Sequence, residues 1–383
     1  MKSICAVQGV EAWGIKEGKY GLAVIRAIGT AAATFTSNRV CAAPVQLMRE
    51  RIAAGKLDAI VVNSGCANAY TGKRGYEDAV KMAGTAAAAL GLPEDRVGVA
   101  STGVIGRYLD LERIDRQCRE VAPHLVSSAE AEVAAARAIM TTDLIEKHAL
   151  VRGDGFTVAG ICKGSGMIAP NMGTMLAFIY TDAAIGAAEL QESIRSAVRR
   201  SFNRVVVDGD ESTNDCAFVT ATGLAGPVDR KAFDAALEAC CISLAKQIAA
   251  DGEGATKMLE VRVTGAPDEA AAEQVARTVV ASPLVKTAVY GEDPNWGRVV
   301  AAAGRAGVIF DPDAISLTIG EGAEETPLVK DGVIVSDLVR AKAAMHGKRV
   351  VFSLDLAAGA GAAAAWGCDL TEKYVEINGK YTT

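Results

Sequence analysis

The residue of this chain best placed to do chemistry is a threonine at the start of an apolar run. Residues 163–173 are rich in Gly, Pro and Asn, and a continuous apolar run extends from Met175 to Tyr180. Thr174 therefore lies where a flexible loop meets a buried strand. This position would present a hydroxyl nucleophile at the mouth of the strand. A threonine hydroxyl is a poor nucleophile unless a base lies beside it.

Histidine, the usual base, is scarce in this sequence. Only His124, His148 and His346 occur, and each has polar neighbours typical of the protein surface. A cut between Gly173 and Thr174 would supply another base, because the freed α-amine has a reference pKa of about 7.7–8.0. Glycine before the cut leaves the backbone free to adopt the distorted geometry that an internal acyl shift requires. From spacing alone, a loop that merely packs into a strand remains the alternative.

Other catalytic and binding motifs fit poorly. The chain has no G-x-S-x-G elbow and no P-loop, and residues 102–106 lack the first glycine of a dinucleotide fingerprint. The acidic segment Asp208–Asp215 opens like a calcium loop. However, Thr213 stands where that loop needs Gly, and Val219 stands where it needs a bidentate Glu. An EF-hand is therefore excluded, whereas a different metal site and a turn rich in Asx hydrogen bonds both stay open.

Composition indicates a globular protein of about two domains. The chain has 383 residues, 50% hydrophobic and 22% charged, and its net charge of -6 argues against a nucleic-acid platform. Nine scattered cysteines without a C-x-x-C pair indicate buried thiols in a reducing compartment. The N-terminus lacks an apolar signal region, and Pro170, Asn171 and Gly173 interrupt the uncharged stretch 164–181. We expect a cytoplasmic protein that binds neither membranes nor nucleic acid.

Strand-like runs alternate with Ala-rich helical runs, which predicts a mixed α/β fold. The predicted strands are 21–27, 59–63, 98–100, 156–163, 175–180 and 216–222. The predicted helices are 76–90, 110–122, 129–140, 188–202 and 230–250. A smaller second domain is predicted from about 257 to 345, with strands 259–264, 285–290 and 315–319 and a helix at 268–282. A last strand, 349–356, leads into an Ala/Gly tract and a polar tail.

The segment around Thr174 resembles the self-cleavage motif of the ornithine acetyltransferase family, the glutamate N-acetyltransferases of arginine synthesis. The resemblance covers essentially the whole chain, and so many motifs in one order make it specific. The matching segments are 35–38, 42–45, 63–69, 101–106, 140–143, 163–167, 174–178, 207–210, 251–257, 291–298 and 374–378. One departure is Gly173, where the family usually has Ala.

The resemblance implies a role for each matching residue. Thr174 becomes the N-terminal nucleophile after cleavage at Gly173–Thr174, and Thr102 and Gly103 form the oxyanion hole. The implied substrate-site residues are Thr141, Lys163, Thr174, Glu253, Asn378 and Thr383. Their types suit ornithine and glutamate: a lysine can neutralise an α-carboxylate and a glutamate can bind an amine. No metal and no cofactor are implied. Some family members also use acetyl-CoA as acetyl donor, and no residue here decides that point.

The implied fold is α/β (α+β): an N-terminal-nucleophile-like αββα sandwich with a second, smaller α/β domain. We expect a main domain at 1–256, cleaved into chains 1–173 and 174–383, a smaller domain at 257–345, and a C-terminal strand and tail at 346–383 that returns to the active site. The chains are expected to pair as an α2β2 heterotetramer. The implied reaction moves acetyl from N2-acetyl-L-ornithine to L-glutamate. Two alternatives are an amidase or aminopeptidase that uses water, and a non-catalytic protein binding a metal or metabolite at 208–215.

Overall fold

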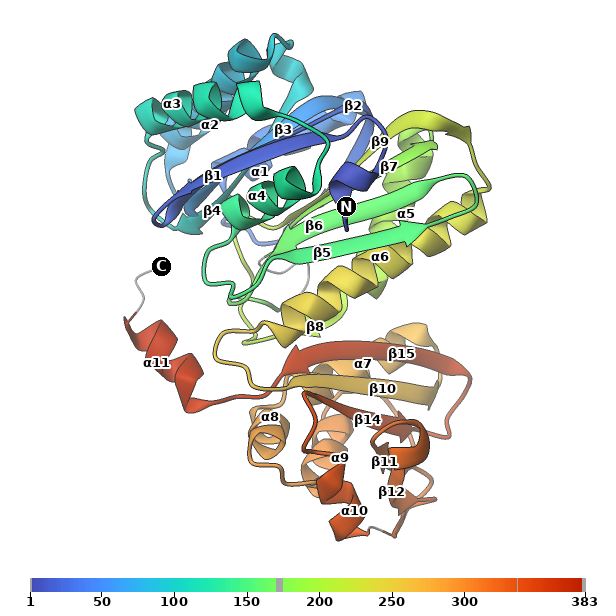
Figure 1. The fold of residues 1–383 in the computed structure, drawn as a ribbon. Helices are drawn as coiled ribbons and strands as arrows, with labels where there is room; N and C mark the ends of the chain where they lie inside the picture. The colour runs from blue at the N-terminus through green and yellow to red at the C-terminus, as the bar shows by residue number, and fades with distance from the viewer. Residues whose placement is uncertain (1, 170–174, 336, 381–383) are drawn as a thin grey trace. The chain divides into compact units, whose positions relative to one another are not determined.

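The computed structural model describes residues 2–169, 175–335 and 337–380. These residues form two compact units (Figure 1). Among them, unit 1 holds residues 2–203 and 210–244, and unit 2 holds 204–209 and 245–380. Unit 2 includes residues 204–209 and 245–256, which the sequence analysis placed in the main domain. It also includes the described residues after 345, to which the sequence analysis gave a separate range.

Unit 1 is built on a sheet with the strand order β4-β3-β2-β9-β7-β6-β5, and β1 pairs with β2. The strands are β1 (Glu11–Glu17), β2 (Tyr20–Phe35), β3 (Lys56–Cys66), β4 (Val97–Val104), β5 (Lys147–Arg152), β6 (Thr157–Lys163), β7 (Leu176–Ala184) and β9 (Cys216–Pro227). The long strand β2 joins two halves of this sheet. Its first part pairs with β1 and β3, and its last part, from Thr30 to Phe35, pairs with β9.

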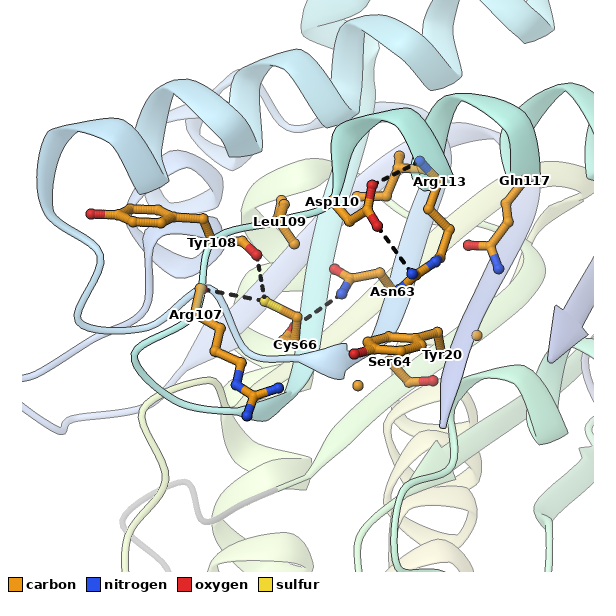
Figure 2. Close-up of a pocket in the computed structure, with 13 residues that line it drawn as sticks. Tyr20, Asn63, Ser64, Cys66, Arg107, Tyr108, Leu109, Asp110, Arg113 and Gln117 are labelled. Atoms are coloured by element: carbon orange, nitrogen blue, oxygen red, sulfur yellow. Dashed lines mark hydrogen bonds and ion pairs between the residues drawn. The ribbon is translucent and has the colours of Figure 1, made fainter. Parts of the chain in front are cut away.

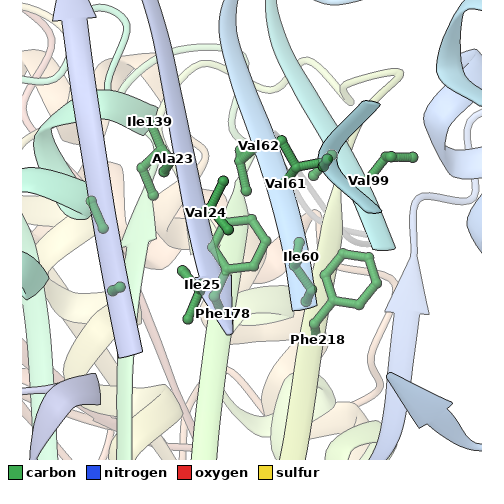
Figure 3. Close-up of a cluster of buried hydrophobic side chains, with 14 of the residues drawn as sticks. Ala23, Val24, Ile25, Ile60, Val61, Val62, Val99, Ile139, Phe178 and Phe218 are labelled. Carbon is green, nitrogen blue, oxygen red and sulfur yellow. The ribbon is translucent and has the colours of Figure 1, made fainter. Parts of the chain in front are cut away.

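The two sheet halves contribute to one buried cluster. Phe178 on β7 and Phe218 on β9 stack with their ring centroids 5.9 Å apart. Figure 3 shows these rings beside Val24, Ile25 and Ile60, which come from β2 and β3. Burial of apolar area stabilises a fold by roughly 25 cal/mol per Å². The cluster therefore fixes the strands whose ends carry the predicted site.

Helices cover both sides of these sheet halves. They are α1 (Ala43–Arg51), α2 (Gly72–Leu90), α3 (Leu111–Val121), α4 (Ala129–Ile139), α5 (Ala187–Arg200) and α6 (Arg230–Ala250), with short 3₁₀ turns at Ile4–Ala6, Ile52–Ala54, Glu94–Arg96, Ala122–His124 and Phe202–Arg204. Figure 1 shows α2 and α3 on one side and α5 and α6 on the other. The predicted α/β class and its helix–sheet–sheet–helix sandwich are confirmed.

Unit 2 is the smaller α/β unit, with the strand order β13-β12-β11-β14-β10-β15-β8. Its strands are β8 (Val205–Val206), β10 (Met258–Ala266), β11 (Ser316–Ile319), β12 (Thr326–Lys330), β13 (Val333–Ile334), β14 (Arg349–Asp355) and β15 (Gly361–Cys368). Its helices are α7 (Glu269–Val280), α8 (Pro283–Tyr290), α9 (Trp296–Gly304), α10 (Leu338–Ala343) and α11 (Glu372–Lys380), with a 3₁₀ turn at Gly322–Glu324. The Ala/Gly tract forms β15, and the polar tail forms α11.

One predicted strand is wrong. Residues 285–290 belong to helix α8, not to a strand. The apolar run Val285–Tyr290 suggested β structure, but Pro283 stands in the first turn, where proline favours a helix. The buried positions Val285, Ala288 and Val289 also follow helical rather than alternating spacing. The other predicted strands and helices of the sequence analysis occur, helix 230–250 with the predicted ends and the rest with shifted ends.

The cysteines agree with the sequence analysis. All nine cysteines are free thiols, and all but Cys41 are buried, as predicted. Among the residues that the structure describes, no helix combines the length and apolarity needed to cross a bilayer. The same residues include no group of three or more His, Cys, Asp or Glu side chains that could hold a metal ion.

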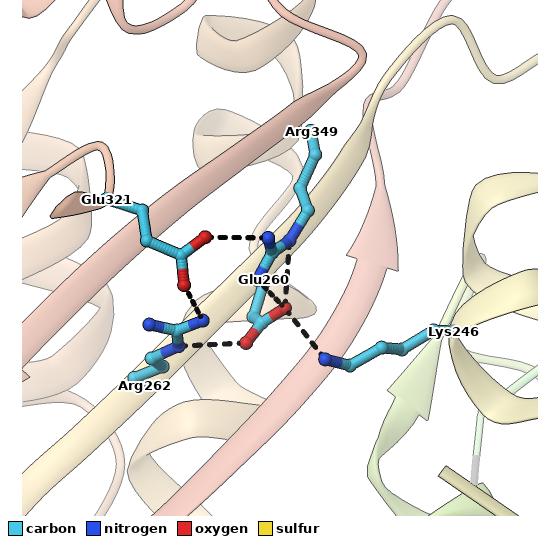
Figure 4. A network of polar contacts seen from close by, with 5 residues as sticks. All are labelled: Lys246, Glu260, Arg262, Glu321 and Arg349. Atoms are coloured by element: carbon cyan, nitrogen blue, oxygen red, sulfur yellow. Dashed lines mark hydrogen bonds and ion pairs between the residues drawn. The ribbon is translucent and has the colours of Figure 1, made fainter. Parts of the chain in front are cut away.

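A charge network ties strands β10 and β14 together in unit 2 (Figure 4). The carboxylate of Glu260 accepts from Arg349 Nη2 at 2.8 Å and Arg262 Nε at 2.9 Å, and it lies 3.4 Å from Lys246 Nζ. Glu321 bridges the same two arginines. Burial alone would raise the pKa of Glu260, but Arg262 and Arg349 outweigh it and hold that pKa below its usual value.

Glu260→Gln is expected to lower the free energy of unfolding by about 2–3 kcal/mol, because three cations lose their buried counter-charge. The effect should fade at acidic pH. A lowered folded-state pKa means that the contribution is complete above the unfolded pKa and is lost as pH falls through the folded one. Urea unfolding at pH 7 and at pH 4 measures this. Equal losses at both pH values would contradict the ionic account.

Candidate active site

Three predicted site residues, Gly173, Thr174 and Thr383, lie outside the described residues, and their assigned roles stay predictions. The remaining predicted residues fall in both units, so each group is described within its own unit. Thr102, Gly103, Thr141 and Lys163 belong to unit 1, whereas Glu253 and Asn378 belong to unit 2.

The predicted oxyanion-hole residues lie near the C-terminal end of strand β4, which runs parallel to β3. Thr102 pairs with Ser64 and Gly103 with Gly65. Gly103 has φ +127°, and a Cβ placed there would lie 2.4 Å from the carbonyl carbon of Gly65. Only glycine fits this backbone and this contact. The close approach of the two strands therefore sets the direction of the backbone at Gly103.

A buried ion pair organises the backbone around Thr141 and Lys163. Asp143 Oδ1 accepts from Lys147 Nζ at 2.8 Å and from the Gly164 N–H at 2.7 Å, and its Oδ2 accepts from the Thr141 N–H at 3.0 Å. Burial alone would raise the pKa of Asp143, but Lys163 and Lys147 outweigh it and hold that pKa well below its usual range. The Asp143 carboxylate thus binds the backbone of Thr141 and the backbone directly after Lys163, and both are predicted substrate-site residues.

Lys16 is a further cation in this neighbourhood, and no sequence pattern indicated it. The residue is exposed on strand β1, but its ammonium reaches inward and donates to Ser64 Oγ at 2.9 Å and to the carbonyl of Met140. Burial, opposed by Asp143 and assisted by Lys163, lowers the pKa of Lys16 to about 8. Lys16 therefore carries a charge that titrates close to neutral pH, next to the carbonyl that precedes Thr141.

A small pocket of about 120 Å³ opens beside the strand that pairs with the oxyanion residues (Figure 2). Asn63, Ser64 and Cys66 line it from β3, and Arg113 from α3 lies over the ring of Tyr20, 3.9 Å from its centroid. Burial raises the pKa of the Cys66 thiol, which donates to the carbonyl of Arg107. A thiol kept protonated is a poor nucleophile, so Cys66 does not compete with a hydroxyl here.

The histidines are all engaged in contacts away from these residues. His124 stacks on Trp13, His346 contacts Glu292, and His148 Nδ1 lies 2.8 Å from Ser3 Oγ. His148 is half-buried, and burial lowers its pKa to about 4, so the expectation of a plain surface position is wrong for this residue. The alternation on β5 buries Lys147 and Ala149 and leaves His148 partly exposed between them, so the strand pattern does not reveal its burial.

Glu253 and Asn378 meet in unit 2, although 125 positions separate them. Asn378 Nδ2, on helix α11, donates to Glu253 Oε2 at 2.8 Å. Gly254 permits this approach, because its φ is +73° and a Cβ there would lie 2.5 Å from the backbone nitrogen of Tyr374. The Thr371 hydroxyl also donates to the carbonyl of Gly254 at 2.8 Å. The return of the C-terminal tail to the active site itself stays a prediction.

The chain matches one family model and many curated relatives. The model described as the ArgJ family matches residues 7–383. The chain is 52% identical to the glutamate N-acetyltransferase of Methanosarcina mazei, over 99% of this chain and 98% of that one. It is 46% identical to the arginine biosynthesis bifunctional protein ArgJ of Archaeoglobus fulgidus, over 99% and 100%. The solved ArgJ chain from Bacillus halodurans is 42% identical with a TM-score of 0.50, over 52% of this chain and 96% of that chain.

Proposed function

Since this chain belongs to the ArgJ family, we propose that it transfers the acetyl group of N2-acetyl-L-ornithine to L-glutamate. The observation that carries the proposal is the match to a glutamate N-acetyltransferase along 99% of the chain. Residue types within each unit support it: buried Lys163 of unit 1 can neutralise an α-carboxylate, and Glu253 of unit 2 can bind an amine. No metal or other cofactor is required, and acetyl-CoA as a second donor is part of the proposal to be tested.

The proposed reaction proceeds in two half-reactions through one covalent intermediate. The hydroxyl of Thr174 attacks the acetyl carbonyl while its free α-amine takes the hydroxyl proton. Donors at Thr102 and Gly103 stabilise the oxyanion, and the proton passes to the leaving amine of ornithine. The amine of glutamate then attacks acetyl-Thr174. N-acetylglutamate leaves, and the threonine hydroxyl recovers its proton.

The mechanism requires self-cleavage between Gly173 and Thr174, because only cleavage frees the amine. The solved ArgJ chain from Bacillus halodurans supports this step. The match includes 96% of that chain but only 52% of this one. Each product of a cut at 173/174 would likewise hold about half of the precursor. We expect the two chains to remain together, to pair as an α2β2 assembly and to act in the cytoplasm.

Two measurements test the function. Denaturing intact mass should give fragments 1–173 and 174–383, and a single chain would remove the proposed nucleophile. Acetate and N-acetylglutamate are then quantified with acetylornithine, with and without glutamate. A transferase makes N-acetylglutamate in proportion to acetyl consumed. Acetate release that glutamate leaves unchanged would instead identify the water-using hydrolase.

Lys16→Met should raise the KM for glutamate by about fivefold at pH 7 with little change in kcat, which corresponds to about 1 kcal/mol of lost attraction. The charge of Lys16 adds to that of Lys163 near an incoming carboxylate, and Asp143 opposes both. Lys16 is protonated below a pKa of about 8 and neutral above it. The ratio of variant to wild-type KM should therefore approach one by pH 10. A ratio that stays constant from pH 7 to pH 10 would contradict this role.

A further inference from the structure

The acidic segment that the proposed reaction leaves unused ends in two buried residues, Asn214 and Asp215. Asn214 is 6% exposed and Asp215 is 0% exposed. Neither side chain faces solvent. The C-terminal end of segment 208–215 is therefore buried and is not a cluster of hydrated surface charges. Each side chain instead contacts backbone that is covalently next to a predicted catalytic residue.

Asp215 holds the backbone that directly follows the proposed nucleophile. The N–H of Met175, the amide bonded to the carbonyl carbon of Thr174, donates to Asp215 Oδ1 at 2.8 Å. The carbonyl of Met175 in turn accepts from the N–H of Cys216 at 3.2 Å. Both backbone polar groups of Met175 are therefore fixed by residues 215 and 216, just before β7 and β9 begin to pair.

Asn214 holds the backbone that directly precedes the oxyanion hole. Its Nδ2 donates to the carbonyl of Ser101 at 2.8 Å and to the carbonyl of Ala67 at 2.7 Å. The hydroxyl of Thr213 donates to Oδ1 of the same amide at 2.6 Å, which fixes the amide's orientation. A peptide unit is planar, so anchoring the Ser101 carbonyl also sets the direction of the Thr102 N–H on its other side.

The two residues are themselves braced by the loop that follows β2. Thr36 donates its N–H to the carbonyl of Asp215 at 2.9 Å and its hydroxyl to the carbonyl of Ser212 at 2.7 Å. The N–H of Ala42 donates to the carbonyl of Thr213 at 2.8 Å. Segment 212–215 thus has little freedom to move relative to the sheet.

We propose that Asn214 and Asp215 form a positioning clamp that holds the backbone directly after the nucleophile and the backbone directly before the oxyanion hole in one fixed frame. The clamp rests on the proposed acetyl transfer and gives a role to residues that do not touch the substrate. Attack on an acyl group requires nucleophile and oxyanion donors to agree in geometry, and a displacement of about 1 Å can cost about a hundredfold in rate.

Asp215 takes part in the clamp as a hydrogen-bond acceptor, through its Oδ1. Burial raises the pKa of this carboxyl well above its usual range, despite the hydrogen bond from Met175 and the charge of Lys163. Its second oxygen, Oδ2, is buried and has no hydrogen-bond partner among the residues that the structure describes. The Oδ1 of an asparagine would present an acceptor oxygen to the Met175 N–H in the same place, so asparagine should replace Asp215 with little loss.

The test compares Asp215→Ala, Asp215→Asn and Asn214→Ala in the full-length chain. Asp182→Ala is the matched control, because Asp182 is also buried (3% exposed) and accepts a backbone N–H, from Thr157, at 2.7 Å. Self-cleavage is followed by denaturing intact mass, and kcat and KM are normalised to the cleaved fraction. Melting temperatures are recorded for all variants.

Asp215→Ala is expected to slow cleavage and to lower kcat by about a hundredfold, with KM within about threefold of wild type. Asp215→Asn should stay within about threefold of wild-type kcat, and Asp182→Ala should lose melting temperature but not kcat. Normal kcat in Asp215→Ala, or an equal loss in Asp182→Ala or in Asp215→Asn, overturns the clamp. If Asp215→Ala does not fold, Asn214→Ala tests the other arm by the same criteria.

Failure of the clamp and failure of the proposed function are distinguishable in this experiment. A wild type that cleaves and transfers acetyl, beside an Asp215→Ala variant of normal kcat, removes only the clamp. A wild type that neither cleaves nor transfers acetyl removes the proposed function, and the clamp is overturned with it.

Discussion

Thr174→Ala should leave one intact chain of 383 residues and reduce acetyl transfer on the order of 10⁶-fold, the size of effect seen when a covalent nucleophile is removed. Alanine lacks the hydroxyl for the acyl shift, so the α-amine that would serve as base is never freed. Cleavage and transfer therefore fail together. Denaturing mass spectrometry and an acetylornithine–glutamate exchange assay measure the two losses separately.

Thr174→Ser is the matched variant, since serine keeps the hydroxyl and, after cleavage, the amine. It should still be cleaved and should form an acetyl-enzyme trappable with acetylornithine alone. An intact Thr174→Ala chain that transfers acetyl at the wild-type rate would rule out Thr174 as the nucleophile. The buried, protonated thiol of Cys66 is not expected to replace it.

Gly103→Ala should lower kcat by about 10²–10³-fold, the cost of losing one oxyanion donor. The methyl group would meet the backbone of Gly65 at 2.4 Å, and alanine resists a φ of +127°. Either β3 or β4 must then shift, and the amide at position 103 turns away from its direction in the wild type. Because the defect is specific to the transition state, KM should change far less than kcat.

Gly106→Ala separates the clash from the cost of a positive φ. Gly106 has φ +76°, and nothing lies within 4 Å of the position of its Cβ. This variant should lose about 1 kcal/mol of stability and keep its kcat. Equal losses of kcat in both variants would mean that backbone strain, rather than the approach of β3, controls activity.

The elements that position the site were largely predictable, because their apolar runs have clear lengths and boundaries. Helix 230–250 was predicted to the residue, and the strand predicted at 156–163 was found at Thr157–Lys163. The predicted strand 285–290 failed because a short apolar run does not distinguish a buried strand from a helix. Only the family resemblance suggested Thr102 and Lys163 as site residues. The local sequence pattern around them does not indicate a catalytic or binding role.

The contacts that join distant residues could not be predicted from the sequence. Nothing near Lys16 indicates that its ammonium reaches Ser64 and Met140. Likewise, the acidic segment suggested a metal loop or a turn, because its spacing does not reveal that Asn214 reaches Ser101 or that Asp215 reaches Met175. Such contacts depend on which strands are neighbours, and register between strands far apart in the chain is not a local property.

The strand order β2-β9-β7-β6 has a consequence for the two products of the proposed cut. β2 and β6 precede residue 173, whereas β7 and β9 follow residue 174. The second product would therefore place two central strands between strands of the first. Separating the products would require breaking two ladders, β2–β9 and β6–β7, in the interior of one sheet. The cleaved enzyme would dissociate only by unfolding, so dilution alone should never release its two chains.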